Sequence, residues 1–95
     1  MTAPEVASFI LSSCPSMTFF ESYMFGSSLR GVGEDIDILL VGPSGDALAQ
    51  LKTEISTAGE ELPLHVLYML PSEATETVFV ENEGCVALSK LAGHR

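Results

Sequence analysis

Apolar residues near the N-terminus recur at the three- and four-residue intervals of a helix. Val6 and Ile10 are four positions apart and therefore share one face of such a helix. Thr2 and Glu5 precede this pattern with the spacing of a capping box. Pro15 follows it, and the residue before a proline avoids helical backbone angles. The first predicted element is therefore a helix that Thr2 caps and Pro15 ends.

Two segments with the composition of strands follow. The segment from Thr18 to Phe25 is dense in aromatic and β-favouring residues, which predicts a strand buried on much of both faces. The segment from Asp35 to Val41 alternates at first and then becomes continuously apolar, which predicts a strand that is polar at its start and buried further along. The aromatic residues of the first strand are expected in the core: Phe19, Phe20, Tyr23 and Phe25.

The middle of the chain repeats the alternation of helix and strand. Ser44 lies in a turn rich in glycine and proline and is predicted to cap a second helix, which Gly59 ends. The segment from Leu62 to Leu70 predicts a third strand, with His65 as its polar interruption. The inner face of the second helix is expected to comprise Ala47, Leu48, Leu51, Ile55 and Ala58.

The C-terminal quarter has a less uniform pattern. One interpretation is a helix from Ser72 to about Asn82, and the alternative is a strand from Thr77 to Val80. The segment from Cys85 to Leu88 has the composition of a short edge strand, and Lys90 to Arg95 that of a frayed tail. In the helical interpretation, the residues facing inward are Ala74, Val78 and Phe79.

This order of elements predicts one small α/β (α+β) domain over residues 1–95, with a mixed sheet covered by helices. The chain is too short for a second core. Its 46% apolar and 18% charged residues are typical of a folded domain rather than a disordered chain. Ligands of such folds usually bind at strand ends.

Acidic residues outnumber basic ones, 13 to 4, which gives a formal net charge of −9. Four basic side chains cannot neutralise the phosphates of a long nucleic acid or attract an anionic membrane. A single nucleotide is compatible with this charge if a divalent metal accompanies it. The first basic residue is Arg30, so a signal peptide is not expected, and no apolar run approaches the roughly 20 residues of a membrane span. Cys14 and Cys85 lack metal-type spacing and are expected to be buried thiols of a reduced, cytoplasmic protein.

Asp35 and Asp37 are the first candidates for chemistry. Residues two apart on a strand point to the same face, so the two Cβ atoms are expected about 6–7 Å apart. A divalent cation between the carboxylates would relieve their repulsion, and oxygen ligands suit Mg²⁺ or Mn²⁺. The alternative is a solvated start of the strand.

Gly26 and Ser27 are the second candidates. A glycine at a strand end lets the backbone approach a bulky anion, and a serine hydroxyl with the amides of the following turn can donate to phosphate oxygens. Arg30 would add positive charge beside them. The alternatives are an ordinary turn and a surface arginine.

Together these residues resemble the motif of the DNA-polymerase-β-like nucleotidyltransferases, and especially their minimal, single-domain branch. The resemblance extends over Phe25-Gly26-Ser27, Ser28-Leu29-Arg30-Gly31 and Asp35-Ile36-Asp37-Ile38-Leu39-Leu40. In that family a hydrophobic strand ends in Gly-Ser, and an acid-x-acid pair stands on the next strand. The predicted order of elements agrees over residues 3–70.

The resemblance implies a metal-dependent transfer of a nucleoside monophosphate to a hydroxyl, with release of pyrophosphate. Gly26 and Ser27 would hold the β- and γ-phosphates of a nucleoside triphosphate, with ATP as the expected one. Asp35 and Asp37 would bind Mg²⁺ or Mn²⁺. The acceptor hydroxyl would belong to a protein or a small molecule.

The resemblance also implies helper roles for Ser28 and Arg30 and a third carboxylate on the third strand. His65 stands where that acid is expected. A neutral imidazole can accept a proton but is a poor ligand for Mg²⁺. The second hypothesis is therefore a catalytically degenerate module that binds a nucleotide and contacts a protein, and the third is a purely structural interaction domain.

The family also suggests partners. Many of its minimal members act with a separate helical protein of the HEPN type, encoded beside them as a toxin–antitoxin pair. A similar protein partner, or an oligomer of this chain, is therefore an expectation here.

Overall fold

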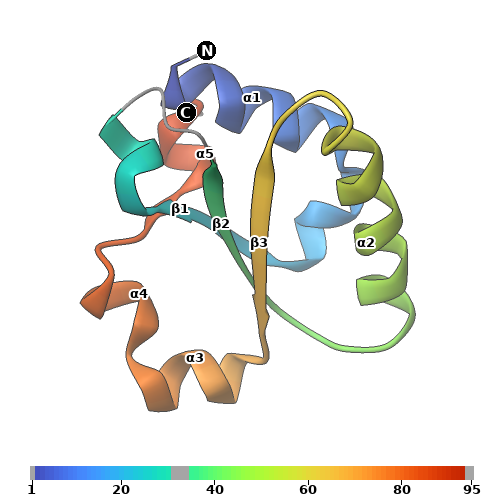
Figure 1. The fold of residues 1–95 in the computed structure, drawn as a ribbon. Coiled ribbons are helices and arrows are strands. Elements are labelled where there is room, and N and C mark those ends of the chain that lie inside the picture. Colours follow the sequence, from blue (N-terminus) through green and yellow to red (C-terminus); the bar gives the residue numbers. More distant parts are fainter. Residues whose placement is uncertain (1, 31–34, 94–95) are drawn as a thin grey trace.

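A four-stranded mixed sheet organises the chain, whose computed structural model describes residues 2–30 and 35–93 (Figure 1). The strands are β1 (Glu21–Phe25), β2 (Ile36–Val41), β3 (Leu64–Met69) and β4 (Val86–Ala87). Their order across the sheet is β3-β2-β1-β4, with β1 antiparallel to β2 and β4, and β2 parallel to β3. This arrangement confirms the predicted single mixed sheet and its short last strand.

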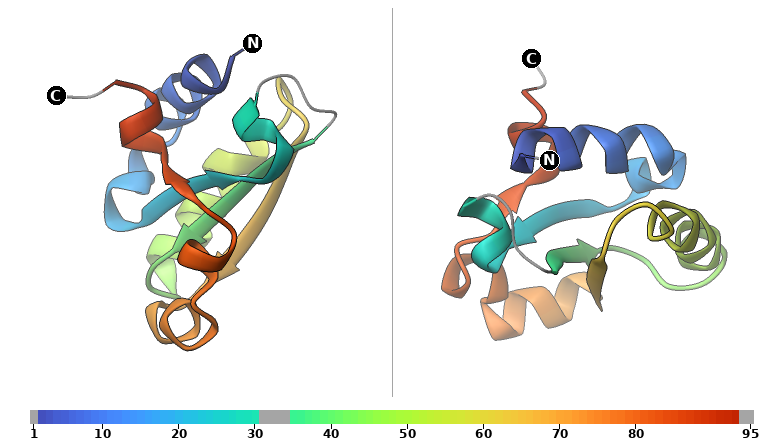
Figure 2. Two further views of the ribbon diagram at one scale, coloured as in Figure 1. Left: turned by 90° about the vertical axis from the view of Figure 1, so that its left-hand side faces the viewer. Right: turned by 45° about the horizontal axis from the view of Figure 1, so that its top comes forward.

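Helices cover both faces of this sheet. The three α-helices on one face are α1 (Ala3–Ser13), α2 (Asp46–Ala58) and α5 (Leu88–Leu91), and the opposite face carries α3 (Pro71–Thr77) and α4 (Phe79–Asn82). In the right-hand view of Figure 2, α1 and α3 lie on opposite sides of the sheet. Two 3₁₀ helices flank β1: η1 (Pro15–Phe19) and η2 (Gly26–Arg30).

The central strand β2 has a core on each face. Ile36, Ile38 and Leu40 are buried in the larger cluster, under α1, α2 and α5. Leu39 and Val41 are buried in the smaller cluster, which includes Ala74 of α3. The continuously apolar end of this segment therefore reflects burial on both sides, as the sequence predicts.

The start of the first helix is as predicted. The Thr2 hydroxyl accepts a hydrogen bond from the Glu5 backbone amide at 3.3 Å, and the Glu5 carboxylate accepts one from the Thr2 amide at 2.8 Å. These reciprocal bonds satisfy two amides that the first turn of a helix leaves without partners.

The predicted start of the first strand at Thr18 is wrong, because η1 occupies residues 15–19 and β1 begins at Glu21. Pro15 has the fixed φ angle that suits a first helical turn. The Ser16 amide and hydroxyl also donate to the Glu54 carboxylate, at 2.9 and 2.8 Å, which fastens η1 to α2. Phe19 is consequently 66% exposed and is not a core residue.

Two predicted helix caps differ from the structure. Gly45, with φ of +89°, is the N-cap of α2 and has no side chain to donate or accept, so the prediction that Ser44 caps this helix is wrong. Gly59 is the predicted C-cap, but it keeps a right-handed φ of −67°. On the inner face of α2, Leu51, Ile55 and Ala58 are buried.

The helix predicted from Ser72 to Asn82 is broken in two, and the alternative strand does not form. Val78 separates α3 from α4 with a φ of +50° and is 44% exposed, so it does not face the core. Thr75 and Thr77 donate their hydroxyls to carbonyls four residues back, which weakens a helix. The predicted tail also differs, because Lys90 belongs to α5, whose Leu88 is fully buried.

None of the helices within the described ranges is both long and apolar enough to span a membrane.

Candidate functional site

Asp37 is the centre of the candidate site, because the sheet brings two distant segments to it. It lies near the start of β2, where its backbone pairs with Phe25 at the end of β1 and with His65 on β3. Its side chain is 24% exposed. The carboxylate is therefore partly sheltered while still reachable from solvent.

Gly26 brings its backbone directly against this carboxylate. It has a φ of +72°, and a Cβ atom added to it would lie 2.7 Å from Oδ2 of Asp37. Only glycine fits both the left-handed backbone and the close approach. The bend after β1 therefore lies directly against the acid on β2.

Ser28 holds this bend in place through two hydrogen bonds to the backbone. Its side chain is buried, and its hydroxyl donates to the Phe25 carbonyl at 2.7 Å and accepts from the Asp37 amide at 3.2 Å. Because the hydroxyl hydrogen is engaged by Phe25, Ser28 positions η2 and Asp37 and is not placed as a phosphate donor. The sequence analysis missed this role, although a serine three residues beyond a strand end often bonds back to the backbone.

His65 lies beside Asp37 on the neighbouring strand. Its Nδ1 is 3.2 Å from Oδ1 of Asp37, and its side chain is 79% exposed. An ionised carboxylate only accepts hydrogen bonds, so Nδ1 carries the hydrogen of this pair and a neutral ring keeps a lone pair on Nε2. The position predicted for a third acid therefore holds an exposed imidazole oriented by the acid opposite it.

The remaining predicted site residues lie on η2 or directly before β2. Ser27 is exposed on η2, and Arg30 is the last residue of η2. Asp35 is exposed in a bend directly before β2. The prediction that Asp35 and Asp37 share one face assumed that both lie on the strand, but only Asp37 does. Gly31 and the rest of residues 31–34 lie outside the described residues.

A divalent cation fits these residues only together with a ligand that brings its own oxygens. Within residues 2–30 and 35–93, no three His, Cys, Asp or Glu side chains are close enough to enclose a metal. Mg²⁺, however, is commonly held by one or two carboxylates and completes its shell with water and phosphate oxygens. Asp37, with Asp35 two residues before it, fits that limited role.

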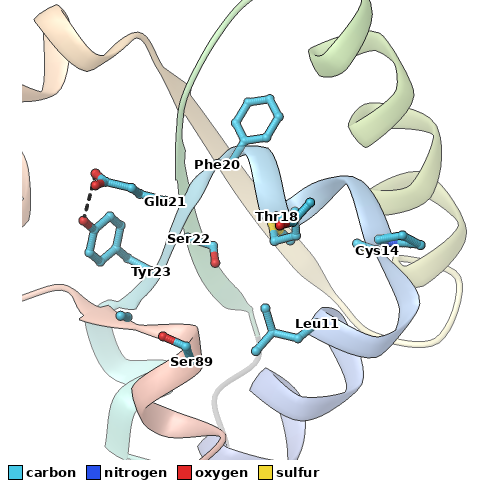
Figure 3. Close-up of a pocket in the computed structure, with 11 residues that line it drawn as sticks. Leu11, Cys14, Thr18, Phe20, Glu21, Ser22, Tyr23 and Ser89 are labelled. Atoms are coloured by element: carbon cyan, nitrogen blue, oxygen red, sulfur yellow. Dashed lines mark hydrogen bonds between the residues drawn. The ribbon is translucent and has the colours of Figure 1, made fainter. Parts of the chain in front are cut away.

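A separate hollow of about 610 Å³ lies at the other end of β1, between α1, η1 and α5 (Figure 3). On one side of it, the Tyr23 hydroxyl donates to the Glu21 carboxylate at 3.2 Å. Burial, reinforced by the negative charge of Glu54, raises the pKa of the Cys14 thiol to about 11. Burial and then Glu21 also raise the pKa of Tyr23. Both groups therefore stay protonated near neutral pH and neither is an activated nucleophile.

No protein-family model, curated protein or solved structure matches this chain. The resemblance to nucleotidyltransferases therefore stays a prediction, and the geometry around Asp37 has to support any function on its own.

Proposed function

We propose that this chain is a metal-dependent nucleotidyltransferase that binds a nucleoside triphosphate, with ATP as the expected one, at the Gly26–Asp37 end of the sheet. One observation carries the proposal. Three residues that are far apart in sequence converge, since Gly26 abuts Oδ2 of Asp37 and His65 bonds Oδ1 of the same carboxylate. The acid can contribute to holding a metal ion, and the imidazole beside it can accept a proton, which are two roles that nucleotidyl transfer uses.

The bend would hold the triphosphate. The exposed Ser27 hydroxyl can donate to its phosphate oxygens, and Gly26 lets the Asp37 carboxylate lie directly beside this bend. Asp37 and Asp35 would hold the Mg²⁺ or Mn²⁺ that accompanies the phosphates. When bound, that ion neutralises negative charge on the phosphates. This role is important because the chain itself has a formal net charge of −9.

His65 would accept the proton of the attacking hydroxyl. The acceptor oxygen forms a bond to the α-phosphorus, the bond from that phosphorus to the bridging oxygen breaks, and pyrophosphate leaves. The hydroxyl proton passes to Nε2 of His65, and Asp37 stabilises the resulting imidazolium through Nδ1.

A second candidate function is a nucleotide-binding module without catalysis. It is favoured by His65, which stands where the resembled family has its third carboxylate.

Label transfer from α-labelled ATP separates the two candidates. The wild type, Asp37→Asn, His65→Ala and a control, Asp46→Asn, are incubated with Mn²⁺ or Mg²⁺, serine-, threonine- and tyrosine-containing peptides, and glycerol. Asp46 is an exposed acid at the start of α2 and is not in the site. An enzyme transfers label in the wild type and the control and loses transfer in Asp37→Asn. Thermal stabilisation by metal and ATP without transfer supports the binding module, and no response to ATP contradicts both candidates.

A further inference from the structure

The outer edge of β3 is open in the described part of the chain. β3 is the last strand on its side of the sheet, with β2 as its neighbour. The Ile36 amide donates to the Pro63 carbonyl at 2.9 Å, and the Gly42 amide donates to the Met69 carbonyl at 3.1 Å. Backbone groups alternate in direction along a strand. The odd-numbered residues of β3 therefore bond to β2, and Val66 and Tyr68 direct their amides and carbonyls outward.

This edge lacks the usual features that prevent strand pairing. β3 has no charged residue and no proline, whereas natural edge strands are commonly interrupted by lysine, proline or a bulge. Leu67 is 38% exposed, and Leu70 beyond the strand is 43% exposed. A six-residue edge of this kind can pair with an added strand.

An apolar hollow lies at the carboxyl ends of the parallel strands β2 and β3, beside the loop that leads from β2 to α2. Its volume is about 170 Å³, and its lining includes Leu40, Leu48, Tyr68, Met69 and Leu70, with Glu73 as its acidic member. It is smaller than the roughly 300–1,000 Å³ of small-molecule sites. Its size and apolar lining suit one side chain of a docked segment.

The charges at the two ends of β3 indicate which occupant fits. Glu60 and Glu61 precede the strand, and Glu73 and Glu76 follow it. The ammonium of Lys52 lies 5.2 Å from the centre of the Tyr68 ring. It is one positive charge beside β3, compared with the four glutamates at the ends of the strand. A second copy paired about Val66 would place Glu60 opposite Ser72 of the other copy, next to Glu73. Like charges would therefore meet at both ends, and each copy has a net charge of −9.

We propose that β3 is a docking edge for an extended segment of another protein that has alternating apolar residues and lysine or arginine at its ends. Backbone hydrogen bonds to Val66 and Tyr68 would add the segment as a fifth strand. One of its apolar side chains would enter the hollow beside Leu70, and its basic ends would face the glutamates. The backbone groups of Val66 and Tyr68 that would pair with the segment are not among the groups proposed to bind the nucleotide, although His65 lies on the same strand. Peptide binding and nucleotide binding are measured separately, so either proposal can fail without the other.

Peptide binding to the full chain tests this edge. The probe has the centre Val-Thr-Leu-Thr-Val with two lysines at each end, and a matched peptide has glutamates at its ends. Two further versions of the lysine peptide carry N-methyl groups on backbone amides. In the first version both threonine amides are methylated, and in the second the amides of the valines and leucine are methylated. Because alternate amides of a strand point to opposite sides, only one of these sets can donate to β3, so methylation of that set should weaken binding about tenfold or more while methylation of the other set leaves it nearly unchanged. Amide resonances of Val66 and Tyr68 should shift on binding.

Charge variants of the protein supply the control. Glu60→Lys with Glu61→Lys should weaken binding of the lysine peptide several-fold, whereas Glu81→Lys with Glu83→Lys, both exposed near α4, should affect it much less. The proposal is overturned if the peptide does not bind, or if the glutamate peptide binds equally well. It is also overturned if the two N-methylated versions behave alike, or if sedimentation shows that a second copy occupies the edge.

Discussion

At the scale of single residues, Gly26 has the strictest requirement in the candidate site. Its φ of +72° and the 2.7 Å distance from an added Cβ to Oδ2 of Asp37 act independently. We predict that Gly26→Ala costs the left-handed strain of about 1–2 kcal/mol and also displaces the carboxylate. Gly84→Ala is the matched control, because Gly84 has a φ of +61° with nothing within 4 Å of an added Cβ.

Urea unfolding and ATP binding distinguish these effects. The backbone strain should destabilise both alanine variants by a similar amount. Gly26→Ala should lose further stability because of the contact with Asp37, and it should also lose metal-dependent ATP binding. Equal behaviour of the two variants in both measurements would show that the contact with Asp37 is unimportant.

The buried thiol of Cys14 gives a second prediction at this scale. Its pKa rises from its ordinary value of 9.0 to about 11, chiefly because it is buried. The folded state therefore holds the thiol proton more tightly than the unfolded state does. This contribution to stability is complete below about pH 9 and disappears as the pH rises toward 11.

Unfolding of the wild type and of Cys14→Ala across this pH range measures the effect. The difference in stability between them should narrow as the pH rises, while Cys85→Ala, which changes a half-buried thiol, should show a weaker trend. A constant difference for Cys14→Ala would contradict the assigned cause.

At the scale of elements, Ser27 and Ser28 are neighbours on η2 with opposite roles. Ser28→Ala removes the hydroxyl that joins the Phe25 carbonyl to the Asp37 amide, so we expect a loss of about 1–3 kcal/mol. Ser27 is exposed, so Ser27→Ala should leave stability nearly unchanged and weaken ATP binding instead. Chemical unfolding and calorimetry on both variants check this separation, and a stability loss in Ser27→Ala equal to that in Ser28→Ala would refute it.

The break between α3 and α4 depends on an unusual residue. Val78 is β-branched, has a φ of +50° and is 44% exposed, so it bears left-handed strain while only part of its side chain is buried. We predict that Val78→Gly stabilises the fold by about 1 kcal/mol. Glu76→Gly, at an exposed position within α3, should destabilise it by a similar amount. Thermal unfolding of both variants measures these changes in stability. A destabilised Val78→Gly would contradict the prediction, because it would show that the valine side chain stabilises the fold by more than its backbone strain costs.

The elements whose patterns are local could be predicted from the sequence. The capping box at Thr2 and the central strand ending at Val41 depend on neighbouring residues or on burial periodicity. The 3₁₀ helix at residues 15–19 could not be predicted, because it is fastened by Glu54, 38 positions from Ser16. The break at Val78 was equally inaccessible, since β-branched residues rarely adopt its backbone angles.

At the scale of the whole molecule, the sheet topology assembles the candidate site. β1 ends where β2 begins, and the parallel register of β2 and β3 sets His65 against Asp37. The sequence analysis selected Gly26, Asp37 and His65 as candidate site residues. It could not give the contacts between them, because these contacts depend on strand register. The prediction that Asp35 and Asp37 lie on one strand did not hold, because the strand begins at Ile36.

The most direct test of this account is paramagnetic broadening by Mn²⁺ in the presence of a non-hydrolysable ATP analogue. We predict that resonances of Gly26, Ser27, Asp37 and His65 broaden only when metal and nucleotide are both present. This broadening should disappear in Asp37→Asn and persist in Asp46→Asn. Broadening centred elsewhere, or equal broadening in wild type and Asp37→Asn, would contradict the claim that this end of the sheet binds a metal–nucleotide complex.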